Sequence, residues 1–147
     1  MITQIYAEHE HSIWKPAATM VNGTTVWTVS GGPIQIISIG ALCVTANNAT
    51  ASTLQYSADG TDGAATTITG ASASLANAAA GTLVVSVAGT LATAPAVYAN
   101  GVGIAGTVGI IVPAGIITTV VGVGSTTGTW RQFIRYRPLT PDSIILG

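Results

Sequence analysis

Residues 34–45 read IQIISIGALCVT, and this run decides the fold class. Apolar side chains occupy both of its alternating faces, which is typical of a strand covered on both sides. A Gly-Gly-Pro run precedes it at residues 31–33 and an Asn pair follows it at 47–48, and both interrupt regular structure. We therefore expect a central β-strand here, inside the core of a β-rich domain.

Shorter strand-like runs lie on both sides of this stretch at regular spacing, separated by turn-forming residues. Their number predicts an all-β fold, a β-sandwich or jelly-roll-like domain over residues 16–147. An extended N-terminal arm over residues 1–15 precedes it. We expect strands over residues 24–29, 53–57, 66–69, 82–88, 97–98, 103–112, 116–123 and 129–137.

Two local features predict more specific structure. Asn22-Gly23 favours a two-residue hairpin turn between 18–21 and 24–29, because both residues tolerate positive φ. Residues 72–80 (SASLANAAA) form the one helix-like segment. Ser72 or Ser74 would cap it, and Gly81 would end it in the left-handed conformation.

Charged side chains are almost absent from the chain. They make up 6% of the residues, with a formal net charge of -1, and none occurs in 16–58 or 63–130. An average soluble domain has about 25%. So few charges, with a net charge near zero, do not indicate a nucleic-acid-binding surface and leave few side chains for acid–base catalysis. We expect other chains to cover much of the surface; the alternative is a surface made soluble by Thr, Ser and Asn.

The single cysteine and the most apolar segment both favour packing roles. Cys43 has no partner for an intrachain disulfide or a cysteine zinc site, so we expect a small buried hydrophobe. Residues 102–124 are long and apolar enough to consider a membrane span. Pro113, several glycines and many β-branched residues favour strands instead, so we expect no membrane contact.

The N-terminal residues 1–15 hold both histidines, both glutamates and the only lysine. Tyr6 and Trp14 would anchor this segment, either as an arm lying on a neighbouring subunit or as the first edge strand of the chain's own sheet. If the segment is extended, His9 and His11 share one side. A metal there would need a third ligand from another subunit; the alternative is a solvated terminal segment.

No arrangement of residues indicates catalysis or a cofactor. A serine nucleophile needs a nearby base, yet the histidines occur only in the N-terminal segment. Asp59 and Asp62 lie in ADGTDGA, where Asp-Gly is ordinary turn chemistry. The glycine pattern over residues 101–106 lacks the helix that a dinucleotide site requires. We therefore expect no enzyme, no metal and no cofactor.

Residues 130–138 (WRQFIRYRP) carry the strongest charge pattern. In a strand, Arg131, Arg135 and Arg137 share one face with Phe133 between them. This face predicts an ionic docking stripe for an acidic partner surface. The alternative is a solvated outer face with Phe133 under the arginine stems.

Two quoted stretches resemble a known class of proteins. VSGGPIQIISIGALCVT, followed by a short Thr-Leu-Gln-Tyr strand, and the ending IVPAGIITTVVGVGSTTGTWRQFIRYRPLTPDSIIL are similar to small β-rich virion proteins of tailed bacteriophages, such as head decoration (cement) proteins. The likeness covers residues 26–146 and transfers no catalytic residue.

The resemblance implies a subunit on the capsid surface of a virion. Such a subunit is often a homotrimer and clamps the major capsid protein from outside. The contact residues would be Tyr6, Trp14, Arg131, Arg135 and Arg137.

A tail or fibre component with a receptor- or carbohydrate-binding role is the alternative within the same class. Exposed aromatic side chains would serve that role. Trp14, Trp27 and Trp130 are the candidates, although a buried core position is the commoner fate of tryptophan.

Overall fold

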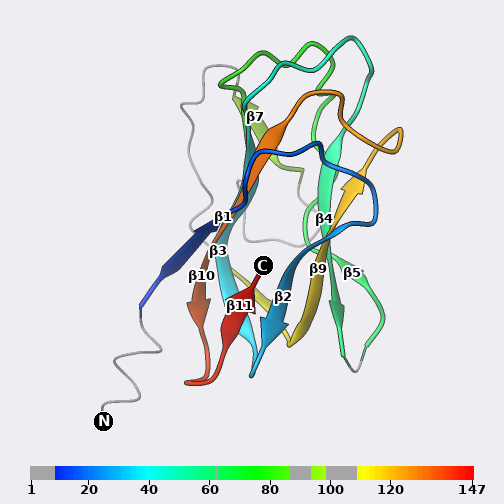
Figure 1. Cartoon of the computed structure of the whole chain (residues 1–147). Helices are drawn as coiled ribbons and strands as arrows, with labels where there is room; N and C mark the ends of the chain where they lie inside the picture. Colours follow the sequence, from blue (N-terminus) through cyan, green and yellow to red (C-terminus); the bar gives the residue numbers. More distant parts are fainter. Residues whose placement is uncertain (1–8, 62, 87–93, 99–108) are drawn as a thin grey trace.

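The computed structural model describes residues 9–61, 63–86, 94–98 and 109–147, and these residues form a β-sandwich (Figure 1). No helix occurs among them. The strands are β1 (His11–Trp14), β2 (Thr25–Ser30), β3 (Ile34–Cys43), β4 (Leu54–Gly60), β5 (Thr66–Thr67), β6 (Leu83–Val85), β7 (Ala96–Tyr98), β8 (Ile110–Val112), β9 (Gly115–Val121), β10 (Trp130–Pro138) and β11 (Ile144–Leu146). The predicted all-β fold is confirmed.

The strands form two antiparallel sheets. The first has the order β1-β10-β3-β6-β7, with β8 also paired to β3, and the second has the order β11-β2-β9-β4-β5. β1 and β11 are therefore edge strands. Both lie on the same side of the sandwich, because His11 of β1 and Ile144 of β11 line one groove.

The core lies between the two sheets. β3 is a central strand of the first sheet, as predicted, with pairing partners on both sides and buried residues along its length. Trp27 and Tyr56 of the second sheet contact each other at 6.0 Å between ring centroids. The Tyr56 hydroxyl donates to the Gly40 carbonyl of β3 at 3.0 Å, so one buried hydrogen bond joins the sheets.

The predicted helix over residues 72–80 is wrong. Its backbone N–H groups bond to distant carbonyls: Leu75 N donates to Ser52 O at 2.7 Å, and Asn77 N to Asn48 O at 2.7 Å. In a helix these N–H groups would instead bond to carbonyls one turn earlier, and the carbonyls of Ser52 and Asn48 would lose these donors. Gly81 does adopt the left-handed conformation, with φ of +90°.

The predicted hairpin around Asn22-Gly23 is also wrong, although the turn itself is present. Gly23 has φ of +76°, whereas Asn22 keeps a negative φ, so the turn is not type I′. Ala18 bridges Trp130 and Val21 bridges Ser125, instead of pairing with β2. The residues before the turn therefore pair with β10 and with the loop between β9 and β10, rather than with β2.

Several other strands are shorter than expected. The predicted strand 82–88 is β6, with residues 87–88 outside the described part of the chain. The predicted strand 103–112 is β8 at its end, and residues 103–108 also lie outside. Within the described residues, a helix able to span a bilayer does not occur.

Candidate docking face on strands β1 and β10

Antiparallel pairing of β1 with β10 brings the candidate contact residues together. Trp14 lies opposite Phe133 and Ser12 opposite Arg135. Because side chains alternate along strands, these four share the outer face of the first sheet. The other pairs, such as Ile13 with Ile134, face the core. Of the two predicted placements of the N-terminal segment, residues 11–14 therefore adopt the edge strand of the chain's own sheet.

The β-bulge between β3 and β10 does not disturb the alignment of the arginines. Arg135 pairs with Ser38 and Tyr136 with Ile36, so Ile37 is the extra residue and lies on β3. An extra residue interrupts alternation only in the strand that carries it. β10 therefore keeps its period of two, and its three arginines stay on the outer face, as the sequence predicted.

Trp14 is the aromatic centre of this face. Its ring stacks on Phe133 at 4.5 Å between centroids, and the Arg131 guanidinium lies over it at 5.5 Å. Its side chain remains 43% exposed, whereas Phe133 beneath is buried. A cation over an indole ring is stabilised by the ring quadrupole. Trp14 thus presents a rigid, partly apolar contact point.

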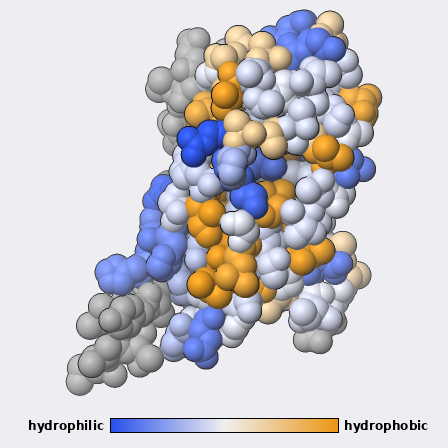
Figure 2. Space-filling model, viewed as in Figure 1, coloured by the Kyte–Doolittle hydropathy of each residue, from blue (hydrophilic) through white to orange (hydrophobic). Residues whose placement is uncertain are grey.

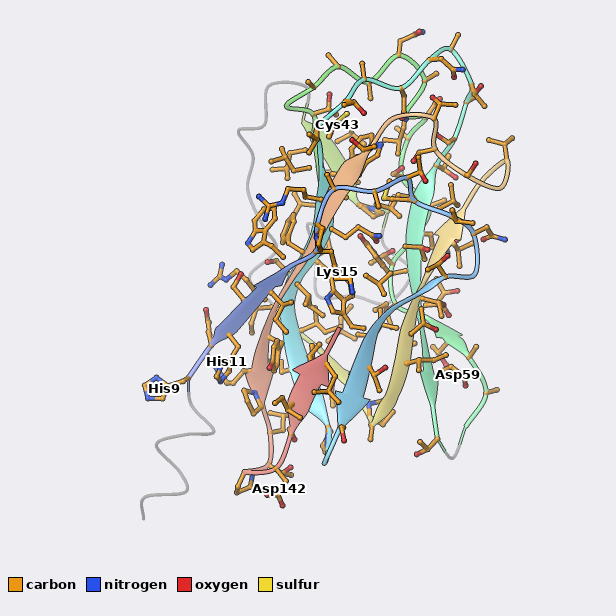
Figure 3. All side chains as sticks on the ribbon, in the orientation of Figure 1. His9, His11, Lys15, Cys43, Asp59 and Asp142 are labelled. Carbon is orange, nitrogen blue, oxygen red and sulfur yellow. The ribbon has the colours of Figure 1, made fainter. Side chains whose placement is uncertain are left out.

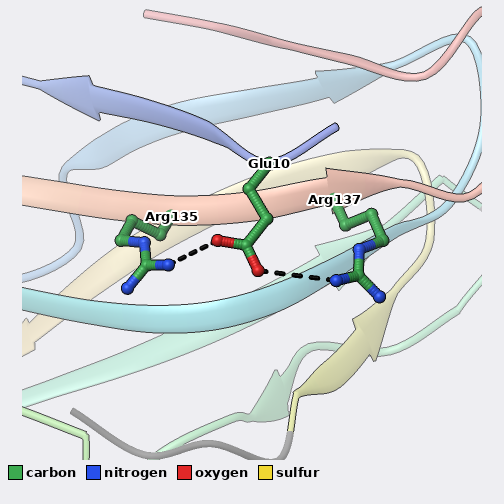
Figure 4. Close-up of polar contacts among 3 residues, drawn as sticks. All are labelled: Glu10, Arg135 and Arg137. Carbon is green, nitrogen blue, oxygen red and sulfur yellow. Dashed lines mark hydrogen bonds and ion pairs between the residues drawn. The ribbon is translucent and has the colours of Figure 1, made fainter. Parts of the chain in front are cut away.

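Glu10 occupies the other two arginines (Figure 4). Its carboxylate accepts hydrogen bonds from Arg135 and, at 3.4 Å, from Arg137. The three side chains are 36–43% exposed, so solvent screens the pair and its net stabilisation is small. The acidic partner of the predicted docking stripe is, in this structure, the chain's own N-terminal segment. Sequence reasoning missed this pairing, because 125 residues separate Glu10 from Arg135.

Arg137 also has a hydrogen-bond donor that its ion pair with Glu10 does not use. Its Nε atom is buried and makes no hydrogen bond within the described part of the chain. A buried unpaired donor costs about 1–3 kcal/mol. Glu10 therefore does not satisfy every donor of the arginine pair.

A shallow groove lies beside this face, on the core side of β1. The His11 ring stacks on Tyr136 at 5.3 Å, and the groove of about 360 Å³ extends along the β10–β11 turn to Asp142 and Ile144. His9 is exposed and labelled in Figure 3 before β1, away from Asp59 and Asp142. In the described segments, no three His, Cys, Asp or Glu side chains gather into a group that could hold a metal.

The other candidates are divided between core and surface. Trp27 and Trp130 are buried, so among the three tryptophans Trp14 is the one that a ligand can reach. Cys43 is buried, and its thiol donates to Thr45 O at 3.2 Å. Asp59 lies at the end of β4. Tyr6 and Asp62 lie outside the described residues.

Sequence reasoning also missed an apolar edge. β11 exposes Ile144 and Leu146 at 48% and 51%, and Figure 2 shows apolar side chains gathered over this strand. The sequence signal was the wholly apolar run of Ile144, Ile145 and Leu146, because successive side chains of a strand face opposite sides and cannot all face the core. An edge strand without charge is prone to pair with another chain.

A separate apolar hollow of about 540 Å³ lies at the end of the sandwich where Pro33 O accepts a hydrogen bond from Leu139 N of the β10–β11 turn. Gly32 and Pro33, the end of β4, and the β8–β9 turn line it, and the lining side chains that the structure describes are all uncharged. Ile111 on its rim is 66% exposed. Its lining suits apolar contacts rather than acid–base chemistry.

Comparison with known proteins identified no relative. No protein-family model matches the chain. No curated protein matches it, and neither does any solved structure.

Proposed function

We propose that this protein is a structural component of a virion, a decoration (cement) subunit on the outside of the capsid. It binds the major capsid protein as a homo-oligomer, a trimer, and stabilises the particle without chemistry. The observation that carries the proposal is a β-sandwich with few charged residues, most of which, among the described residues, lie along one pair of strands. Glu10, Lys15 and the three arginines all lie on or next to β1 and β10.

The apolar surface supports a role in assembly. Ile111, Val123, Ile144 and Leu146 are large apolar side chains exposed on the isolated chain. Interface centres are depleted in charge, and exposed apolar patches mark contact sites. A subunit that buries such surface between capsid proteins adds association free energy at every lattice position.

The β1–β10 face carries the side chains that would orient the subunit on the capsid. Trp14 with Arg131 resembles the aromatic and arginine anchors that dominate many interfaces. Arg135 and Arg137 already bind one carboxylate, which shows the ligand chemistry that their geometry suits. We assign the capsid contact to this face, together with Tyr6 and the rest of the N-terminal segment.

Cosedimentation with undecorated particles tests the proposal. The full chain should sediment with particles, whereas a chain lacking residues 1–15 should fold and lose binding at least about tenfold. Because truncation also removes β1, Trp14→Ala is the second variant, and Asp59→Asn on the other sheet is the matched control. Decoration by the truncated chain and by Trp14→Ala at the level of the full chain would contradict this assignment of the face.

One observation favours a tail or fibre component as the second candidate. Trp14 is exposed beside a guanidinium, an arrangement that also suits a sugar ring and its hydroxyl groups. In that case the protein would bind host-surface glycans, and Trp14→Ala would abolish the binding. An absence of glycan binding by the wild-type chain would remove this candidate.

A further inference from the structure

Strand β1 is bound to β10 in the manner of a peptide ligand. Lys15 N donates to Gln132 O at 2.8 Å, which extends the four-pair ladder by one residue. Successive side chains also have their own partners on β10: Trp14 has Phe133, Ile13 has Ile134 and His11 has Tyr136. A backbone ladder plus alternate side-chain sites is how proteins recognise an added strand.

The same strand is attached to the domain on one side only. β1 pairs with β10 and with no other strand among the described residues. The segment that follows it begins with Pro16, which cannot donate to a ladder, and within residues 16–19 the chain pairs with β10 again at Ala18. Opening at Pro16 therefore releases β1 without breaking either sheet elsewhere.

We propose that β1 is exchanged between copies of this chain: His11–Trp14 of one copy adds to β10 of a second copy, in the register seen within one chain. The occupant of the released β10 edge is a second copy, because the contacts that hold β1 in its own domain hold the identical segment equally well. This inference rests on the homo-oligomer in the proposed function, and it does not depend on the capsid.

Charge complementarity favours this occupant over an unrelated strand. Glu10 and the arginine pair form a selective contact at one end of the ladder, and Trp14 with Phe133 and Arg131 forms another at the opposite end. A foreign strand would have to carry a carboxylate and an aromatic ring with the same spacing. The N-terminal segment of a second copy carries both by identity.

Cross-linking of the purified chain tests the exchange. Ser12 lies directly opposite Arg135, and both are accessible. In a Cys43→Ala background, a chain with Ser12→Cys and Arg135→Cys can form one disulfide across the β1–β10 pair. The bond forms within one chain if β1 is closed and between chains if it is exchanged. Ser12→Cys alone is the control for random cross-linking.

We expect covalently linked oligomers on a non-reducing gel. By mass action, the ratio of linked dimer to monomer at low occupancy should rise about tenfold for a tenfold increase in concentration. Two results would overturn the exchange: only monomer bands from a sample that light scattering shows to be oligomeric, or a chain that remains monomeric at every concentration.

The same variant separates this inference from the proposed function. A chain oxidised when dilute is locked with its own β1. If the locked monomer decorates particles as well as the unlocked chain, exchange plays no part in decoration, and the capsid role remains. If the double-cysteine chain forms linked oligomers but the wild-type chain, with Arg135 intact, never sediments with particles, the exchange holds and the capsid role fails.

Discussion

Asn47 connects three segments at one end of the sandwich. Its amide donates to Leu75 O at 3.0 Å, and its carbonyl oxygen accepts from Gly128 N at 2.7 Å and from the Trp130 indole at 3.2 Å. Asn47→Ala should lower the free energy of unfolding by about 2–5 kcal/mol, because two buried donors lose their acceptor. Denaturant unfolding measures this change.

Asn48→Ala is the matched control for that measurement. Asn48 is exposed, and its side chain accepts one bond, from Thr50 N at 2.8 Å. We expect a loss of about 0.5–1 kcal/mol. Equal losses in the two variants would show that Asn47 does not hold these segments together.

Cys43 makes stability depend on alkaline pH. Burial raises the pKa of its thiol above the ordinary value of 9.0. Above that pH the unfolded thiol loses its proton while the folded one keeps it, so the folded state binds more protons. The free energy of unfolding should therefore fall as pH rises past about 9, by up to about 1.4 kcal/mol per pH unit.

Denaturation between pH 7 and 11 checks this dependence. Cys43→Ala should be less stable at neutral pH because of the lost packing, yet its stability should fall less steeply above pH 9. Tyr56, whose pKa burial also raises, contributes equally in both chains at still higher pH. Parallel curves for the two chains would contradict the assignment to Cys43.

At the residue scale, the sequence predicts which side chains share a face but not what they bind. Period-two alternation places Arg131, Arg135 and Arg137 together, and the bulge on β3 leaves that pattern intact. Glu10 lies one residue before β1 and follows the alternation of that strand. Its pairing with arginines 125 and 127 residues away depends on tertiary structure that no local pattern contains.

At the scale of the element, Gly40 allows β3 to approach β6 and Phe133. A Cβ at this position would lie 2.1 Å from Val84 O and 3.0 Å from Phe133 Cζ. Gly40→Ala should therefore shift β3 against β6 and cost about 2–3 kcal/mol. Thermal unfolding measures the loss, and Gly63→Ala, which has open space around it, should be nearly neutral. Comparable melting temperatures for both variants would exclude this close approach.

Elements with strong periodicity were predictable, and those defined by distant partners were not. β3 and β10 have buried patterns that span most of their lengths, so their bounds agree with the sequence within a few residues. Residues 72–80 have high helix propensity, but carbonyls of the 48–52 loop accept their backbone N–H groups. Their conformation is therefore set by tertiary hydrogen bonds rather than by local preference.

At the scale of the whole molecule, each sheet presents one edge strand, β1 or β11, on the same side of the sandwich, and the opposite edges are β7 and β5. β1 on that side has charged flanks, Glu10 and Lys15, whereas β11 exposes apolar side chains. Composition predicted a covered surface, since so few charges are available to solvate it. Which strands lie at the sheet edges could not be predicted, because that depends on the strand order.

Cryo-electron microscopy of the particles with which this protein copurifies tests the central claim most directly. If the protein is a decoration subunit, density that fits the sandwich should repeat over the whole capsid lattice, with the β1–β10 face toward the major capsid protein. Density confined to the tail or to a single vertex, or the absence of any particle, would contradict that account.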